Sequence, residues 1–246
     1  LTPHAAVAHA DGHVFTICDQ MDELCRLCFS AEGDSIIAFA LSSEHLFEVC
    51  NVVVQLLAAS VVHSVILYKW DSREPGLINA PTLEYLMEMC QSLKDLTLEK
   101  LEMDEDQIRV LGTCSRPDLE IELTRCKLTN AGSSALAEAL GRNQGPTKLD
   151  DCHMDNYVLA SGLRGNTRLK SFKPCVSTNI EVGSRELLAI ADALKENKGL
   201  VDLKFWHNSW LSKDILDAVC DSLKTHPTLQ SLGLWYLWTH ERARFS

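Results

Sequence analysis

One spacing of apolar residues recurs along this chain and constrains its fold more than any other feature. In residues 200–210, apolar residues occupy the first, fourth, sixth and eleventh positions, and Asn208 occupies the ninth. Alternate residues of a strand point to the same side, so the fourth and sixth positions predict a short strand with one buried face. At the ninth position the backbone leaves the strand. An asparagine there can satisfy backbone groups that no neighbouring strand reaches, and a small buried cysteine can replace it.

The same spacing is found eight times in the chain. The first positions of the copies fall at residues 36, 62, 93, 118, 144, 169, 200 and 229, so successive copies are 25 to 31 residues apart. The copies that begin at 93, 118, 200 and 229 fit well, and Cys126 is the ninth residue of the second of these. The copies at 36, 62 and 144 are looser, with Phe39 and Leu41 as the inward residues of the first. In the copy at 169, Pro174 takes an inward position.

Between the predicted strands, apolar residues change to the spacing of an amphipathic helix. Leu187, Ile190 and Leu194 share one face of a helix predicted in residues 183–197, with Ser184 as its predicted cap. Further helices are predicted in residues 81–90, 132–141, 158–163 and 215–223. One strand, one turn and one helix fill the length of each copy.

This alternation resembles the leucine-rich-repeat family, specifically its ribonuclease-inhibitor-like branch. Residues 126–140 and 200–210 carry the resemblance, which extends over roughly 36–240. It implies an α/β fold, a right-handed leucine-rich-repeat solenoid with a curved parallel β-sheet inside and helices outside. We therefore predict a leucine-rich-repeat domain of about eight repeats in residues 36–246, with no visible C-terminal cap. Residues 1–35 are predicted to be an N-terminal helical cap or a flanking segment.

The charge and the cysteines restrict the partners and the compartment. The formal net charge is −11, and lysine and arginine form no stripe, so we predict no nucleic-acid partner. The ten cysteines are dispersed, and several fall in core positions of the repeats. We interpret them as reduced thiols of a cytoplasmic, intracellular protein.

Two clusters contain residue types that can bind metal ions, but neither has the spacing of a metal site. Cys25 and Cys28, with Cys18 and His13 nearby, are a candidate zinc cluster, but no second cysteine pair at zinc-finger spacing follows them. The acidic group in residues 99–106 lacks the spacing of a calcium loop, and carboxylates favour the beginning of a helix. We therefore predict no metal and no cofactor.

Residues 49–68 have two interpretations. These twenty residues contain no charged side chain, and that length can cross a bilayer as a helix. The alternative is a repeat helix in residues 47–59 followed by a buried strand in residues 62–67, because short buried elements are also continuously apolar. The repeat spacing continues through the segment, so we favour the second interpretation and predict no membrane partner.

The sequence contains no recognised catalytic motif. His207 with Asp202 and His153 with Asp151 are candidate acid–base pairs, but nine histidines in a chain of this length make such pairs common. We therefore predict that the protein is not an enzyme.

Side chains that flank the inward residues point out of the sheet and are the candidates for binding. From the last two repeats we predict a partner-binding site formed by Lys204, Trp206, His207, Gln230, Trp235 and Tyr236. Exposed aromatic residues are typical binding anchors, although packing of the two tryptophans on each other is an equally valid interpretation. A secondary site, suited to a partner with basic and apolar groups, is predicted at Glu99, Lys100, Glu122 and Arg125.

The sequence thus predicts a protein–protein interaction scaffold that binds an unidentified protein on the concave face of a solenoid. Two alternatives remain open. One is a membrane-anchored repeat protein that uses residues 49–68. The other is a regulator of a small GTPase, which rests only on the resemblance to ribonuclease-inhibitor-like repeat proteins, some of which act in this way.

Overall fold

Strands and helices alternate along the chain, as the repeat spacing predicts. The computed structural model describes residues 7–10, 12–17, 36–41, 64–69, 76–114, 116–205, 213–224 and 226–234. The strands in these residues are β1 Val7–Ala10, β2 Gly12–Ile17, β3 Ile36–Leu41, β4 Ser64–Lys69, β5 Gly76–Leu77, β6 Asp95–Glu99, β7 Leu101–Met103, β8 Glu120–Thr124, β9 Lys127–Leu128, β10 Lys148–Cys152, β11 Ser171–Pro174, β12 Asp202–Phe205 and β13 Ser231–Leu234. The helices are α3 Ala80–Met89, α4 Glu105–Thr113, α5 Asn130–Gly141, α6 Asn156–Leu163, α7 Ile180–Leu194 and α8 Lys213–Leu223.

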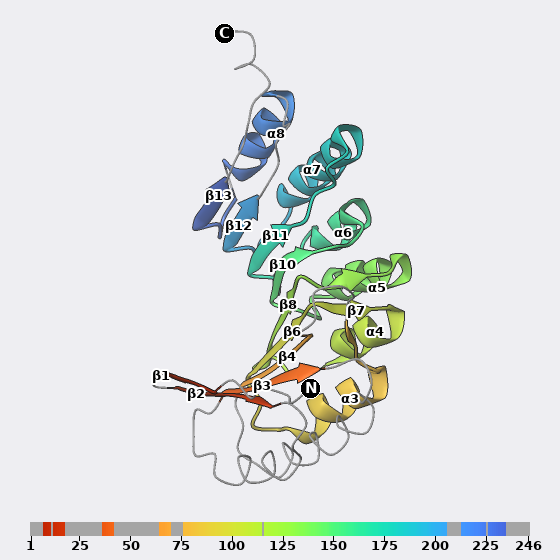
Figure 1. Ribbon diagram of the computed structural model, residues 1–246. Coiled ribbons are helices and arrows are strands. Elements are labelled where there is room, and N and C mark those ends of the chain that lie inside the picture. The colour runs from red at the N-terminus through yellow and green to blue at the C-terminus, as the bar shows by residue number, and fades with distance from the viewer. Residues whose placement is uncertain are drawn as a thin grey trace.

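Ten of the strands form one sheet in which neighbours follow the order of the chain. The order is β1-β2-β3-β4-β6-β8-β10-β11-β12-β13, and every pair is parallel except β1 with β2. The short strands β5, β7 and β9 form a second parallel sheet. Helices α3 to α8 lie in a row on one side of the large sheet, in chain order (Figure 1). The fold is therefore α/β with a mostly parallel sheet, which confirms the predicted class.

The fourth and sixth positions of the repeats fill the space between the sheet and the helices. In β6 and β8, exposed and buried residues alternate along each strand, as predicted. Leu96, Leu98, Ile121 and Leu123 are at most 1% exposed. Full burial of one such side chain stabilises a fold by about 1.5–3 kcal/mol, so each of these positions contributes to the stability of the core.

The predicted turn after each strand has the same backbone shape in three successive repeats. Lys100, Arg125 and Asp151 each occupy the eighth position of their repeat, and their φ angles of 55°, 51° and 56° lie in the left-handed region. The turn brings the ninth residue into the core, where Cys126 and Cys152 are fully buried. 

The two ninth-position thiols satisfy backbone carbonyls of the preceding strand. Cys126 Sγ donates to Leu98 O at 3.2 Å, and Cys152 Sγ donates to Leu123 O at 3.3 Å. Burial raises the pKa of Cys152 well above its ordinary value, so this thiol keeps the proton that it donates. The predicted role of a buried cysteine at this position is confirmed.

The beginnings of the helices confirm one prediction and correct another. Asp104 caps α4 in a capping box with Gln107, and acidic residues occupy the first turn, as expected for the acidic group in residues 99–106. The predicted cap of α7, Ser184, is wrong. The helix begins four residues earlier at Ile180, and Asn179 Oδ1 accepts from the backbone N–H groups of residues 181 and 182.

The common alignment of the repeats is wrong at two places. Phe39 pairs with Leu67, so it occupies the sixth position of its repeat and not the fourth, and this repeat starts two residues earlier than predicted. At the other place, Leu149 on β10 pairs with Leu123 on β8 and, on its other side, with Phe172 on β11. The pairing of β10 with β11 is irregular between Asp150 and Cys152. The alignment therefore shifts by two residues between β10 and β11. Two residues is one period of a strand, so the same residues stay buried.

Several predictions fall on the N-terminal part of the chain. For residues 1–35 we predicted a helical cap or a flanking segment, whereas the described part of this range forms strands β1 and β2, which extend the sheet. The cysteines of the candidate zinc cluster lie outside the described residues. The last five residues of the apolar segment 49–68 belong to β4, as the strand interpretation predicts, and the rest of it lies outside the described residues. In the described part of the chain, no helix combines the length and the apolar character that a membrane span needs.

Candidate functional site

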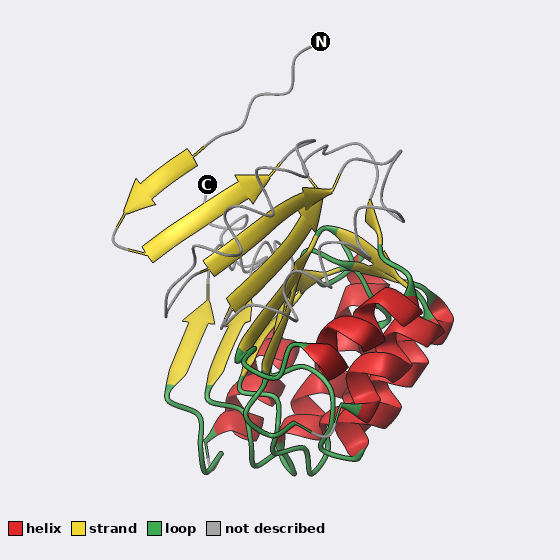
Figure 2. Ribbon diagram, turned by 90° about the horizontal axis from the view of Figure 1, so that it is seen from below, coloured by secondary structure: helices red, strands yellow, loops and turns green. Residues whose placement is uncertain are grey.

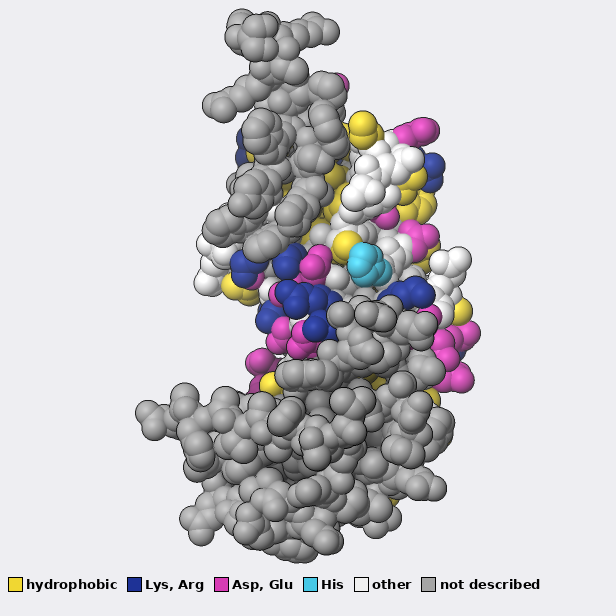
Figure 3. All heavy atoms as spheres, viewed as in Figure 1, with side chains coloured by type: hydrophobic (Ala, Val, Ile, Leu, Met, Phe, Trp, Pro, Cys, Tyr) yellow, Lys and Arg dark blue, Asp and Glu magenta, His cyan; other side chains and the backbone are white. Residues whose placement is uncertain are grey.

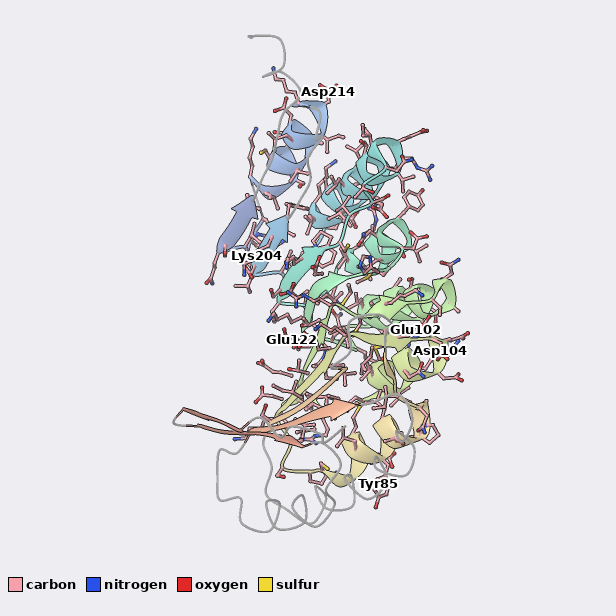
Figure 4. All side chains as sticks on the ribbon, viewed as in Figure 1. Tyr85, Glu102, Asp104, Glu122, Lys204 and Asp214 are labelled. Atoms are coloured by element: carbon pink, nitrogen blue, oxygen red, sulfur yellow. The ribbon has the colours of Figure 1, made fainter. Side chains whose placement is uncertain are left out.

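The two sides of the large sheet differ in what covers them. All helices of the described residues pack against one side (Figure 2). We call the other side, as formed by the outward residues of β6, β8, β10, β11, β12 and β13, the open face. Its residues are Asp95, Thr97, Glu99, Glu120, Glu122, Thr124, Lys148, Asp150, Ser171, Lys173, Asp202, Lys204, Ser231 and Gly233. Glu122 and Lys204 lie on this side in Figure 4, whereas Glu102 and Asp104 lie towards the helices.

Ion pairs connect neighbouring strands across the middle of the open face. Lys148 Nζ on β10 is 2.6 Å from Glu122 Oε1 on β8. Lys173 Nζ on β11 is 2.8 Å from Asp150 Oδ1 on β10, and Lys173 is only 12% exposed. Acidic and basic side chains accordingly alternate over β8, β10 and β11 in Figure 3. Because each ion pair joins two neighbouring strands, it restricts the conformations of both of its side chains.

The carboxylate of Asp202 on β12 binds one side chain of β11 and one of its own strand. Its Oδ2 atom accepts from Ser171 Oγ at 3.0 Å and from Lys204 Nζ at 2.6 Å. Burial alone would raise the pKa of Asp202, but hydrogen bonds from Lys204, Ser231 and Ser171 outweigh it, and the pKa lies below its ordinary value. Asp202 is therefore ionised near neutral pH and fixes the lysine beside it.

The structure describes two residues of the predicted main site. Lys204 lies on the open face in β12, where its ammonium group is paired with Asp202. Gln230 is exposed directly before β13, and its backbone N–H donates to Val201 O at 2.8 Å. The four remaining residues of this site lie outside the described residues; they are Trp206, His207, Trp235 and Tyr236.

The predicted secondary site is brought together only in part. Glu99 Oε1 lies 3.7 Å from Arg125 Nη1 and 3.9 Å from Lys100 Nζ, so these three residues form one cluster where β6 and β8 end. Glu122, the fourth residue of the predicted site, lies on β8 and pairs with Lys148 on β10 instead of with this cluster. Lys100 and Arg125 also occupy the left-handed turn positions, so their backbone has a structural role besides any role in binding.

Three of the four residues of the central ion pairs were not predicted from the sequence; they are Lys148, Asp150 and Lys173. Two features hid them: the weak repeat in residues 144–154, and Pro174 in an inward position of the next repeat. The sequence does contain a signal for two of them. Lys148 and Asp150 flank the inward Leu149, and the two neighbours of an inward strand residue must both face outward.

Only one candidate acid–base pair, His153 with Asp151, lies entirely within the described residues, and no hydrogen bond or ion pair joins its two members. Asp151 lies 4.0 Å from Lys173, and Asp202 bonds Lys204, while His207 lies outside the described residues. His153 Nδ1 is instead 3.5 Å from Cys175 Sγ. Burial raises the pKa of Cys175 to about 11, so this thiol is protonated near neutral pH and is a poor nucleophile.

The described cysteines are free thiols; they are Cys90, Cys114, Cys126, Cys152, Cys175 and Cys220. Within the same ranges of the chain, histidine, cysteine and acidic residues form no group of three or more that could hold a metal ion.

No model of a protein family matches the chain, and no curated protein matches it.

Proposed function

We propose that this chain is a right-handed leucine-rich-repeat solenoid of the ribonuclease-inhibitor-like type and that it binds another protein through its open face. Three features support the repeat assignment. The parallel strands follow one another in chain order, the turns after β6, β8 and β10 share one backbone shape, and thiols at the ninth position bond the carbonyl of the preceding strand. Each unit then buries its apolar face only against its neighbours, as in a solenoid.

The observation that carries the binding proposal is a charged sheet face that no described helix covers. Polar and charged residues alternate there with fully buried leucines, so the sheet presents a regular array of side chains to one side. The pairs Glu122–Lys148, Asp150–Lys173 and Asp202–Lys204 fix long side chains in one geometry. Side chains that are already ordered lose little entropy on association, so such an array favours specific docking.

A pair of charge-reversal variants tests the proposal. The open-face variant combines Glu122→Lys with Lys204→Glu. The matched control combines Glu138→Lys on α5 with Lys224→Glu directly after α8, two residues that are 59% and 72% exposed at their side chains on the helix side. Both variants keep the net charge of the chain, and urea unfolding is used to check that both are folded.

The full chain and the two variants are used to capture proteins from a native extract, and each captured protein is quantified. We expect at least one protein whose recovery is unchanged with the control variant and reduced about tenfold or more with the open-face variant, a loss of about 1.4 kcal/mol. Equal recovery with wild-type chain and open-face variant for every captured protein would show that the open face is not the binding surface.

A further inference from the structure

The open face carries more acidic than basic side chains. Its acidic residues are Asp95, Glu99, Glu120, Glu122, Asp150 and Asp202, and its basic residues are Lys148, Lys173 and Lys204. Each of these three lysines forms an ion pair with an acidic residue of the same face, at 2.6 to 2.8 Å. At the ends of β6 and β8, Lys100 and Arg125 lie beside Glu99. The described cations of this surface are therefore each paired within the chain.

Two acidic residues of the open face remain without a cation, Asp95 on β6 and Glu120 on β8. Both are exposed, and no lysine, arginine or histidine of the described ranges forms an ion pair with either carboxylate. The two residues are direct partners in the pairing of β6 with β8. Like charges directly opposite each other on neighbouring strands destabilise a sheet. The chain thus carries an unfavourable pair of charges that a cation from outside would relieve.

An apolar side chain lies next to this pair of carboxylates. Ile66 on the neighbouring strand β4 pairs with Thr97 on β6, one outward position beyond Asp95. Ile66 is half-buried and faces outward, because its two neighbours in the strand are buried in the core. A long basic side chain can lay its methylene stem on such a surface and keep its charged end among polar groups. We call this surface the acidic lane; its residues are Ile66, Asp95, Thr97 and Glu120.

The spacing of the two carboxylates favours arginine over lysine as the cation. Neighbouring strands lie about 4.8 Å apart, so one planar group can reach a side chain on each of them. A guanidinium group presents five N–H donors in a rigid fork and can bind carboxylates on two sides, whereas an ammonium group is a compact point charge.

We propose that the acidic lane receives an arginine side chain of the partner protein, with the guanidinium group between Asp95 and Glu120 and the methylene stem against Ile66. This inference rests on the proposed binding role of the open face and adds the chemistry of the partner. The residues predicted for the secondary site are instead paired with one another or with Lys148.

The test measures binding of a short fluorescein-labelled peptide of alternating glycine and arginine to the full chain, by fluorescence anisotropy at low salt. The lane variant combines Asp95→Asn with Glu120→Gln. The matched control combines Glu84→Gln with Glu88→Gln, two exposed residues of α3 on the helix side. Both variants lose the same amount of negative charge, so any general attraction of the peptide to an acidic chain falls equally in both. Urea unfolding is used to check that both are folded.

We expect the Kd of the arginine peptide to rise about tenfold in the lane variant, a loss of about 1.4 kcal/mol, and to stay within about twofold of wild type in the control. A peptide with lysine in place of arginine should bind wild type more weakly. No binding of the arginine peptide to wild type, or the same Kd for both variants, would overturn the proposal. Equal affinity for the lysine peptide would overturn the assignment of arginine.

The outcome is separate from that of the capture experiment with the open-face variant. If a captured protein depends on the open face but the peptide does not distinguish the lane variant from its control, only the arginine site is wrong. If the peptide distinguishes them but no captured protein depends on the open face, the proposed function is wrong and the arginine site in the lane stands.

Discussion

At the scale of single residues, a second ladder of side chains connects the repeats, and sequence analysis missed it. Asn166 and Asn197 each lie three residues before the first position of a repeat and are at most 1% exposed. Their Nδ2 atoms donate to the carbonyls of Leu140 and Leu163 in the preceding helices, at 2.6 and 2.7 Å. Their Oδ1 atoms accept from backbone N–H groups that lead into the next strand. Each asparagine therefore ties the end of one helix to the segment that leads from the next helix into its strand, which joins α5 to the start of β11 and α6 to the start of β12.

In the last described repeat, His226 takes the place of this asparagine. Its Nδ1 atom accepts from the N–H of Leu229 at 3.2 Å, but its buried Nε2 atom has no partner among the described residues. Burial lowers the pKa of His226 below 6.5. The unfolded chain therefore binds the proton more tightly, and the stability that the neutral ring provides is present above pH 6.5 and is lost as pH falls below it.

We predict that His226→Asn restores the ladder. Asparagine offers the same acceptor to Leu229 and a donor to the end of α7, so the variant should gain about 1 kcal/mol at neutral pH. It should also lose the part of the acid sensitivity that the histidine causes. Urea unfolding of both proteins at pH 7.5 and pH 5 measures this, because all other titrating groups are shared. If the difference between the two proteins is the same at both pH values, His226 does not titrate as described.

At the scale of elements, the sequence predicted the strands better than their alignment. Large apolar residues at the fourth and sixth positions give an unambiguous period of two, so β6, β8, β12 and β13 lie where they were predicted. The start of α7 was missed because its first turn contains exposed Ile180 and Val182, which do not continue the buried stripe. The shift between β10 and β11 could not be predicted, because a move of two residues leaves the pattern of burial unchanged.

The close packing of adjacent helices depends on small residues at their contacts. A Cβ atom on Gly162 in α6 would come within 2.2 Å of Ala137 O in α5, so any side chain there pushes the two helices apart. On Gly141, at the end of α5, a Cβ atom would meet no atom within 4 Å. A side chain at Gly162 would therefore clash with the neighbouring helix, whereas a side chain at Gly141 would not.

We predict that Gly162→Ala destabilises the protein by about 1–3 kcal/mol, the usual cost of overpacking. Gly141→Ala should be neutral or stabilise by up to about 1 kcal/mol, because alanine has less backbone freedom to lose on folding. The free energy of unfolding in urea distinguishes the two. Equal effects of both substitutions would mean that α5 and α6 do not pack as closely as described.

At the scale of the whole molecule, the two sides of one sheet differ, because one side packs on the helices and the other is the surface that we propose for binding. Inward residues pack on the helices, and outward residues form an array in which ion pairs join β8, β10 and β11. Ser171 on β11 donates a hydrogen bond to Asp202 on β12. The sequence predicted this division, because alternate residues of a strand must face opposite ways. It did not predict which charges pair, because pairing depends on the alignment of neighbouring strands.

The central claim is that successive repeats stack as parallel neighbours in chain order, and nuclear Overhauser effects between labelled methyl groups test it most directly. Leu98, Leu123 and Leu149 lie on three successive strands and are paired in register. We predict strong effects from Leu123 to both other leucines, because it lies between them. Effects that link Leu98 with Leu149 while Leu123 contacts neither would contradict the stacking order and, with it, the open face.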